Sequence, residues 1–154
     1  MSNSWNEELK TILTTPGTVA LLATINGDGT PHAAVMEFVS LAENGTLEYL
    51  ELLESSHSYR NLNASLWFSK TVAILISNPD GNRYLITGKP VKISISGSTF
   101  EERYVWIREQ RGDVDLAAVC IIEIIDVVEE TFAVRFAQQE ADRPFYTHLD
   151  RIAR

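Results

Sequence analysis

The chain has 154 residues, of which 45% are hydrophobic and 22% are charged. This size and composition are typical of one globular domain with its own hydrophobic core. The formal net charge is -8 and Lys and Arg form no cluster, which argues against a nucleic-acid partner. We therefore expect one domain over residues 1–154, with an N-terminal helix in 1–14 and a C-terminal extension over 129–154.

The sequence favours a cytoplasmic protein without disulfides or metal sites. Its first residues lack signal-peptide features, and no apolar run is long enough to span a membrane. Cys120 is the only cysteine and lies in an apolar run, so we expect a core residue. The three histidines lack the paired spacing of metal ligands: His32, His57 and His148.

Strand patterns dominate the chain from residue 19 to residue 128. Six segments have apolar or alternating patterns and are bounded by turn signals or helix patterns: Val19–Ile25, Pro31–Leu41, Leu47–Leu53, Thr71–Ser77, Arg83–Ser96 and Leu116–Val128. The Asn-Gly turns after the first two segments predict hairpins. In the fifth segment, Val91, Ile93 and Ile95 alternate with polar residues, which predicts one buried face. A buried helix is the alternative for Leu116–Val128.

Helix patterns interrupt these strands. A first helix is predicted over Ser4–Leu13, with capping-box spacing between Ser4 and Glu7, and a second runs from about His57 to Ser65. A third begins at Ser98 or Thr99 with side-chain caps, and its core face carries Phe100, Tyr104 and Ile107. Pro144 could begin a terminal helix.

The corner between Leu47–Leu53 and the second helix has the chemistry of an anion-binding site. Ser55, Ser56 and Ser58 can cap the helix, whose first amides have no partner within it. Arg60 could add a positive charge. An ordinary capped turn is the alternative. The anion-site hypothesis fails if the chain's own carboxylates fill this corner and leave no cavity beside it.

Several motifs together resemble the FMN-binding split barrel of the pyridoxamine 5′-phosphate oxidase-like superfamily, particularly its small bacterial FMN-binding proteins. They are the Gly-Thr-Val-Ala-Leu-Leu-Ala-Thr strand, the Gly-Asp-Gly hairpin tip, Pro31-His32, and Ser-His-Ser-Tyr-Arg-Asn-Leu over residues 56–62. The resemblance implies a mainly β fold with accessory helices: a six-stranded, antiparallel, Greek-key-like split barrel. It also implies a homodimer with a small-molecule cofactor, FMN, at the interface.

The resemblance also implies a set of FMN-binding residues. Those that would hold the phosphate are Leu53, Glu54, Ser55, Ser56, His57, Ser58, Tyr59 and Arg60, and those along the isoalloxazine ring are Val35, Met36 and Glu37. Many relatives carry basic residues near the phosphate, whereas this chain has Met36, Glu37 and Ser58 at those positions. A carboxylate beside a phosphate would repel it unless it points away.

These observations leave more than one function open. The first hypothesis is an FMN-binding flavoprotein, acting in oxidoreduction or electron transfer on an unknown substrate. No side chain in the sequence is assigned a catalytic role, and whether the protein is an enzyme stays open. The alternative is a split-barrel dimer that has lost FMN and serves as a binding or regulatory module for another ligand. Haem or a deazaflavin as the cofactor is a third possibility.

Overall fold

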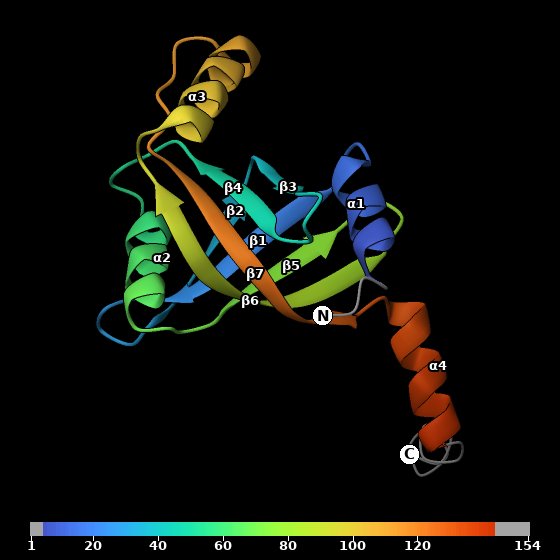
Figure 1. Ribbon diagram of the computed structural model, residues 1–154. Coiled ribbons are helices and arrows are strands. Elements are labelled where there is room, and N and C mark those ends of the chain that lie inside the picture. The colour runs from blue at the N-terminus through green and yellow to red at the C-terminus, as the bar shows by residue number, and fades with distance from the viewer. Residues whose placement is uncertain (1–4, 144–154) are drawn as a thin grey trace.

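A computed structural model of the protein describes residues 5–143. In this part of the chain, seven antiparallel strands form one curled sheet in the order β2-β1-β5-β6-β7-β4-β3 (Figure 1). The strands are β1 Val19–Ile25, β2 Pro31–Met36, β3 Val39–Leu41, β4 Leu47–Glu51, β5 Val72–Ser77, β6 Arg83–Ser94 and β7 Ala118–Glu129. The helices in the same range are α1 Asn6–Thr14, α2 His57–Trp67, α3 Ser98–Arg111 and α4 Phe132–Asp142.

The expected single strand Pro31–Leu41 is two strands, which corrects the count from six to seven. β2 lies at one edge of the sheet and β3 at the other, and only Glu37 and Phe38 separate them in the chain. This short connection brings the two edges of the curled sheet together, as in a split barrel. The carbonyl of Phe38 accepts a hydrogen bond from the Leu50 amide at 2.9 Å, which holds the connection against β4.

The predicted hairpin between β1 and β2 is confirmed, with β1 at its predicted bounds. The amide of Asn26 donates to the Thr30 carbonyl at 2.8 Å, and the Asp28 carboxylate accepts from the Thr30 amide and hydroxyl. Gly29 has a φ of +89°, a conformation that glycine adopts without steric cost. Local turn chemistry therefore sets the register of this hairpin.

The long strands β6 and β7 pair along most of their length, so Leu116–Val128 contains a strand and the buried-helix alternative is wrong. The predicted buried face at Val91, Ile93 and Ile95 is only partly confirmed, because Ile93 packs against the core and the other two do not. The register shifts between Pro90 and Lys92, and both Val91 and Ile95 are exposed. A β-bulge of this kind interrupts the alternation of side chains, so the pattern does not hold through it.

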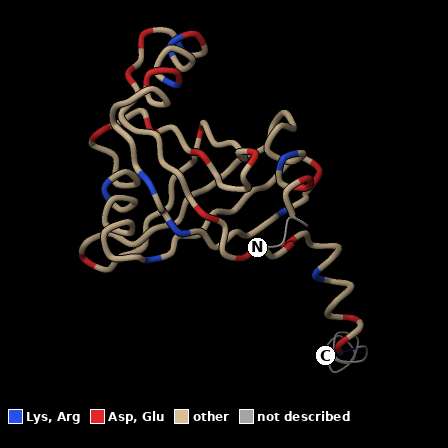
Figure 2. Tube along the Cα trace, viewed as in Figure 1, with Lys and Arg blue, Asp and Glu red and all other residues tan. Residues whose placement is uncertain are grey.

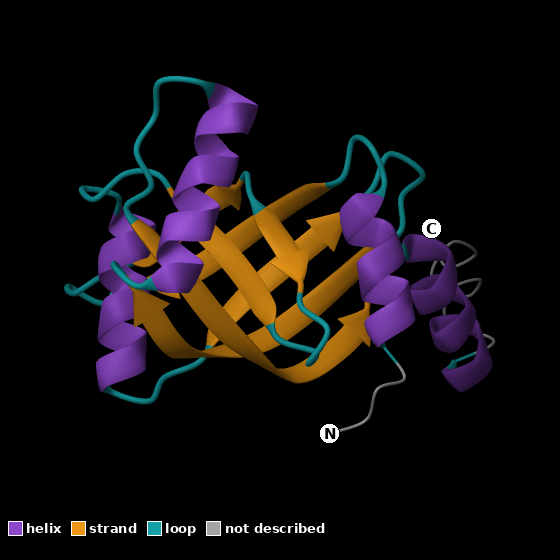
Figure 3. Cartoon of the chain, turned by 45° about the horizontal axis from the view of Figure 1, so that its top comes forward, coloured by secondary structure: helices purple, strands orange, loops and turns teal. Residues whose placement is uncertain are grey.

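The core fills the inside of the curled sheet and is closed by two helices. Leu9 and Ile12 from α1 and Leu62 from α2 are buried against strand residues. The strand residues of this core are Ala20, Leu22, Met36, Leu47, Tyr49, Val72, Ile74, Ile76, Tyr84, Ile86, Ala118, Cys120, Ile122, Ile124 and Val127. Cys120 is fully buried, as predicted. Figure 3 shows the helices around the margin of the sheet.

A second, smaller core attaches α3 to the sheet. Ile107 is fully buried beside Leu50, Leu116 and Val119, and Phe100 and Tyr104 pack on the same cluster, so the predicted core face is confirmed. The predicted caps are wrong. Gly97 precedes the helix, and neither Ser98 nor Thr99 makes a side-chain cap.

The first and last helices also differ in detail from the prediction. α1 begins at Asn6 without a side-chain cap, and Ser4 lies outside the described residues. α4 was not predicted and has no buried residue. It projects away from the sheet in Figure 1. The terminal helix expected from Pro144 lies outside the described residues.

Charged residues are spread over the described chain. Figure 2 shows Lys and Arg distributed over the described chain together with Asp and Glu, and β6 is a strand that carries basic residues without acidic ones. No helix within residues 5–143 combines the length and hydrophobicity that crossing a membrane would require. The same residues contain no group of three His, Cys, Asp or Glu side chains arranged to hold a metal ion.

Candidate functional site

The corner between β4 and α2 has the predicted helix cap. Ser56 precedes the helix in an extended conformation, and its hydroxyl accepts a hydrogen bond from the Tyr59 amide at 2.9 Å. The predicted helix start at His57 is therefore confirmed. Capping by a serine satisfies one of the amides that a first helical turn leaves unpaired.

A carboxylate of the chain itself occupies part of this corner. Glu51 ends β4 and is only 5% exposed. Its Oε2 accepts from the amides of Leu52 at 3.0 Å and Leu53 at 3.1 Å. Its Oε1 accepts from the Ser56 hydroxyl at 2.7 Å and the Tyr49 hydroxyl at 3.1 Å. Four donors thus saturate the carboxylate, which compensates for its burial.

The hydroxyls around Glu51 have fixed roles. Burial, and next the neighbouring charge of Glu51, hold the pKa of Tyr49 well above its usual value, so this phenol keeps its proton and donates. The Ser56 hydroxyl accepts a hydrogen bond from the Tyr59 amide and donates one to the Glu51 carboxylate. The helix cap and the buried carboxylate therefore form one continuous network.

A cavity of about 520 Å³ lies beside this network. Five of the residues predicted for the FMN site line it: Val35, Glu37, Leu53, Ser56 and Ser58. The other lining residues are Ala34, Phe38, Tyr49, Leu50, Glu51, Leu52, Arg111, Val114 and Asp115. Its volume is in the range of small-molecule and cofactor sites. The anion-site hypothesis was to fail if carboxylates of the chain filled the corner and left no cavity. A carboxylate does fill part of the corner, but a cavity remains beside it, so the hypothesis stands for the part that is left.

The other predicted site residues do not line this cavity. Met36 is buried in the core, and Tyr59 packs against that core. Three more are exposed and absent from the cavity lining, namely Glu54, Ser55 and Arg60. His57 is also exposed, and its ring stacks on the ring of His32. The structure thus brings together the strand and helix portions of the predicted set, without the positive charge expected from Arg60.

The positively charged residue at the cavity comes from a part of the sequence that gave no signal. Arg111, at the end of α3, forms an ion pair with Glu37, and its guanidinium lies 5.5 Å from the centre of the Phe38 ring. The inward position of Glu51 had a usable signal in the sequence. Leu47, Tyr49 and Glu51 alternate on one face of a strand, and the first two are apolar or aromatic.

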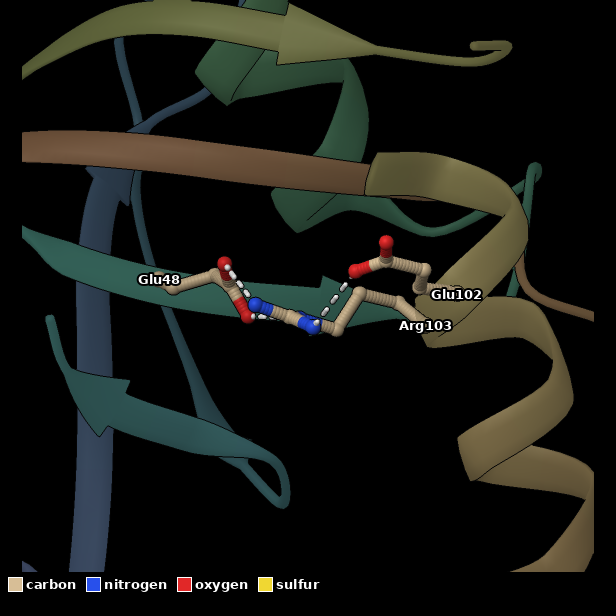
Figure 4. A network of polar contacts seen from close by, with 3 residues as sticks. All are labelled: Glu48, Glu102 and Arg103. Atoms are coloured by element: carbon tan, nitrogen blue, oxygen red, sulfur yellow. Dashed lines mark hydrogen bonds and ion pairs between the residues drawn. The ribbon is translucent and has the colours of Figure 1, made fainter. Parts of the chain in front are cut away.

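A second cavity, of about 320 Å³, lies on the other side of the Glu37-Phe38 connection. It is lined by Glu37, Phe38, Val39, Ser40, Glu48, Leu50, Arg103 and Trp106. In Figure 4, Arg103 reaches from α3 to Glu48 on β4, with an Nε–Oε2 distance of 2.6 Å, while Glu102 lies 3.8 Å from the same guanidinium. The Arg103–Glu48 ion pair connects α3 with β4, whereas Glu102 belongs to the same helix as Arg103.

The donors left over at the corner decide how well it fits a phosphate. The amides of His57 and Ser58 have no hydrogen-bond acceptor among the described residues. Ser58 lines the cavity and is 4% exposed, and its hydroxyl has no hydrogen-bond partner among the described residues. The amides of Leu52 and Leu53 are already taken by Glu51. The cavity therefore fits a ring-sized ligand, whereas only part of the corner is available to a phosphate.

Comparison with known proteins gives matches in structure alone. The chain matches no protein-family model and no curated protein sequence. HupZ from Group A Streptococcus has a TM-score of 0.65 and 19% identity over 82% of this chain and 94% of its own. An FMN-binding protein from Syntrophomonas wolfei has a TM-score of 0.64 and 11% identity over 82% of this chain and 86% of its own.

A third solved structure extends this agreement. A pyridoxamine 5′-phosphate oxidase-related, FMN-binding protein from Nostoc punctiforme has a TM-score of 0.60 and 13% identity, over 80% of this chain and 82% of its own. The chain thus has the split-barrel fold of the pyridoxamine 5′-phosphate oxidase-like and FMN-binding proteins.

Proposed function

We propose that this protein binds a flavin in the cavity between β2, the β4–α2 corner and α3. The observation that carries the proposal is the cavity itself, about 520 Å³ in volume and lined by Ala34, Val35 and Leu53 near unpaired donors of α2. An apolar wall with a few polar groups at one end is typical of cofactor sites. The FMN-binding relatives of this fold support the same ligand class.

In the proposed complex, the residues of the chain bind and orient the ligand. The isoalloxazine ring lies along β2, and the ribityl end points toward the His57 and Ser58 amides at the start of α2. A bound flavin supplies the redox chemistry, which supports oxidoreduction or electron transfer as the activity. No cavity-lining side chain is proposed as an acid, base or nucleophile, and the substrate is left open.

Absorbance of the purified protein tests this proposal directly. Bound flavin gives bands at about 370 and 450 nm. If the protein is colourless, it is titrated with FMN and with riboflavin up to about 100 µM while flavin fluorescence is measured. A dissociation constant of that size corresponds to a binding free energy of roughly 5 kcal/mol, which sets the weakest binding that the titration detects. Absence of binding by both flavins would refute the proposal. A haem or deazaflavin cofactor would give a different spectrum in the same measurement.

A matched pair of variants locates the ligand. Ala34 lines the cavity, whereas its neighbour Ala33 is exposed and does not. Ala34→Leu should weaken flavin binding by about tenfold or more, because it fills space that the ring needs. Ala33→Leu should leave the affinity within about twofold, because Ala33 does not line the cavity. Equal effects would place the ligand elsewhere.

The second candidate function is a split-barrel dimer that binds another ligand and no flavin. The observation in its favour is Glu51, which occupies backbone donors that a phosphate would use. Binding of neither flavin, together with a stable dimer, would favour this candidate.

A further inference from the structure

The side chain of Glu51 stands where an anionic ligand would have to sit. The Leu52 and Leu53 amides and the Ser56 hydroxyl all donate to it within 3.1 Å. At 5% exposure, it is a fixed part of the fold and not a surface group that can turn away. We propose that Glu51 is a built-in anion that makes this cavity select a flavin without a phosphate over its phosphate ester. The inference rests on the flavin binding proposed above.

Displacing Glu51 to admit a phosphate would leave another group without a partner. The Tyr49 hydroxyl is buried and donates to Glu51 at 3.1 Å. If the carboxylate moved out, this hydroxyl would lose its acceptor inside the protein. Keeping both anions in the corner is also unfavourable, because like charges at short range repel in a poorly solvated site. Both alternatives weaken the binding of a ligand that carries a phosphate, and neither affects the binding of the isoalloxazine ring.

The remaining charges of the cavity do not compensate for Glu51. Its lining contains two further carboxylates, Glu37 and Asp115, and Arg111 is the only Lys or Arg among the described lining residues. Arg111 is already paired with Glu37. Arg60, which could have supplied another charge, lies outside the lining. An uncharged ribityl chain can still use the His57 and Ser58 amides and the Ser58 hydroxyl as hydrogen-bond donors.

Riboflavin and FMN provide a direct test because they differ only in the phosphate ester. The wild-type protein should bind riboflavin at least as tightly as FMN. Glu51→Gln keeps the shape of the side chain and removes its charge, so it should raise FMN affinity by about tenfold and leave riboflavin within about twofold. Glu54→Gln is the matched control. It removes an exposed charge three residues away that does not line the cavity, and the affinity ratio should stay constant.

The results separate this inference from the proposal of flavin binding. FMN binding that is about tenfold tighter than riboflavin binding in the wild type would overturn the selectivity. An affinity ratio that does not change in Glu51→Gln would overturn the role of Glu51. In both cases flavin binding itself would stand. Binding of neither flavin by any variant would refute the proposed function instead.

A second arm tests the corner without any flavin. The Tyr49→Phe/Glu51→Ala double variant removes the carboxylate together with the buried hydroxyl that needs it, which frees the Leu52 and Leu53 amides. Inorganic phosphate should raise the melting temperature of this variant, relative to chloride at equal ionic strength, and should not raise that of the wild type. Circular dichroism checks that the variant is folded, and Glu51→Gln serves in the same assay if it is not. The inference is overturned if phosphate stabilises no variant, or stabilises the wild type equally.

Discussion

The rings of His32 and His57 stack with their centres 5.3 Å apart and their planes inclined by 15°. His32 lies in β2 and His57 begins α2, so the contact joins the first helical turn to the edge of the sheet beside the cavity. The Nδ1 atom of His32 is buried and has no hydrogen-bond partner among the described residues. The ring contact thus adds to the hydrogen bonds by which the Asn61 side chain of α2 donates to Thr24 and Asn26 of the β1–β2 hairpin.

Removing this ring contact should destabilise the protein slightly. His57→Ala is expected to lower the free energy of unfolding by about 0.5–1.5 kcal/mol, because a stacked ring pair is lost. His57→Phe keeps a ring at the same place and should recover most of the loss. Urea denaturation of the three proteins gives the comparison. Equal stabilities of His57→Ala and the wild type would show that the contact contributes nothing.

Gly88 is a position where even a methyl group should be costly. A Cβ there would lie 2.6 Å from Cγ2 of Ile122, at the register shift in β6. Gly88→Ala should therefore lower the free energy of unfolding by about 1–3 kcal/mol through overpacking. Gly27→Ala is the control, since no atom lies within 4 Å of the added carbon. Chemical denaturation measures both, and similar stabilities would contradict the close packing.

The attachment of α3 depends on one buried side chain. Ile107→Ala should cost about 2–5 kcal/mol of unfolding free energy, because it leaves a cavity in the small core beneath the helix. Val105 is 58% exposed on the same helix, and Val105→Ala should cost less than about 0.5 kcal/mol. Hydrogen exchange should become faster in α3 of the first variant alone. Unchanged exchange there would mean that the ion pair to β4 holds the helix.

The thiol of Cys120 should be unreactive in the folded protein. Burial, and next the charge of Glu51, raise the pKa of this thiol to about 12, above its ordinary value. At pH 8 fewer than about one thiol in a thousand is ionised, and the thiolate is the reactive form. A thiol reagent should label no residue in the native state and one residue per chain after denaturation. Stoichiometric labelling of the native protein at pH 8 would contradict this.

Two exposed apolar residues at the cavity lead us to expect a homodimer that covers them. Val35 is 55% exposed and Leu53 is 64% exposed, and both line the cavity. Light scattering should give twice the mass of one chain. Val35→Asp should shift the protein toward monomer and weaken flavin binding together, because burying a charge at an interface is unfavourable. Ile25→Asp, at an exposed residue outside the cavity lining, is the control. A monomeric wild type would contradict the expectation.

Local sequence alone was enough to predict several elements correctly. The bounds of β1, the turn at Asn26–Gly29, the cap at Ser56 and the core face of α3 around Ile107 all follow from residues within a few positions of one another. Backbone preference, side-chain caps and apolar periodicity act over this short range. The bulge after Pro90 shows the limit, because the shift of register interrupts the alternation and leaves Val91 exposed.

The contents of the site depended on contacts between distant parts of the chain. Glu37 meets Arg111, 74 residues away, because the edges of the sheet close at the Glu37-Phe38 connection and α3 packs over it. The sequence by itself determined that a capped helix follows β4, since that cap depends on Ser56 and Tyr59. Alternation along β4 places Glu51 on the same face as Leu47 and Tyr49. Only the tertiary structure decided that this carboxylate would be enclosed and held by the Leu52 and Leu53 amides, because strand pairing and core packing close that face of the sheet.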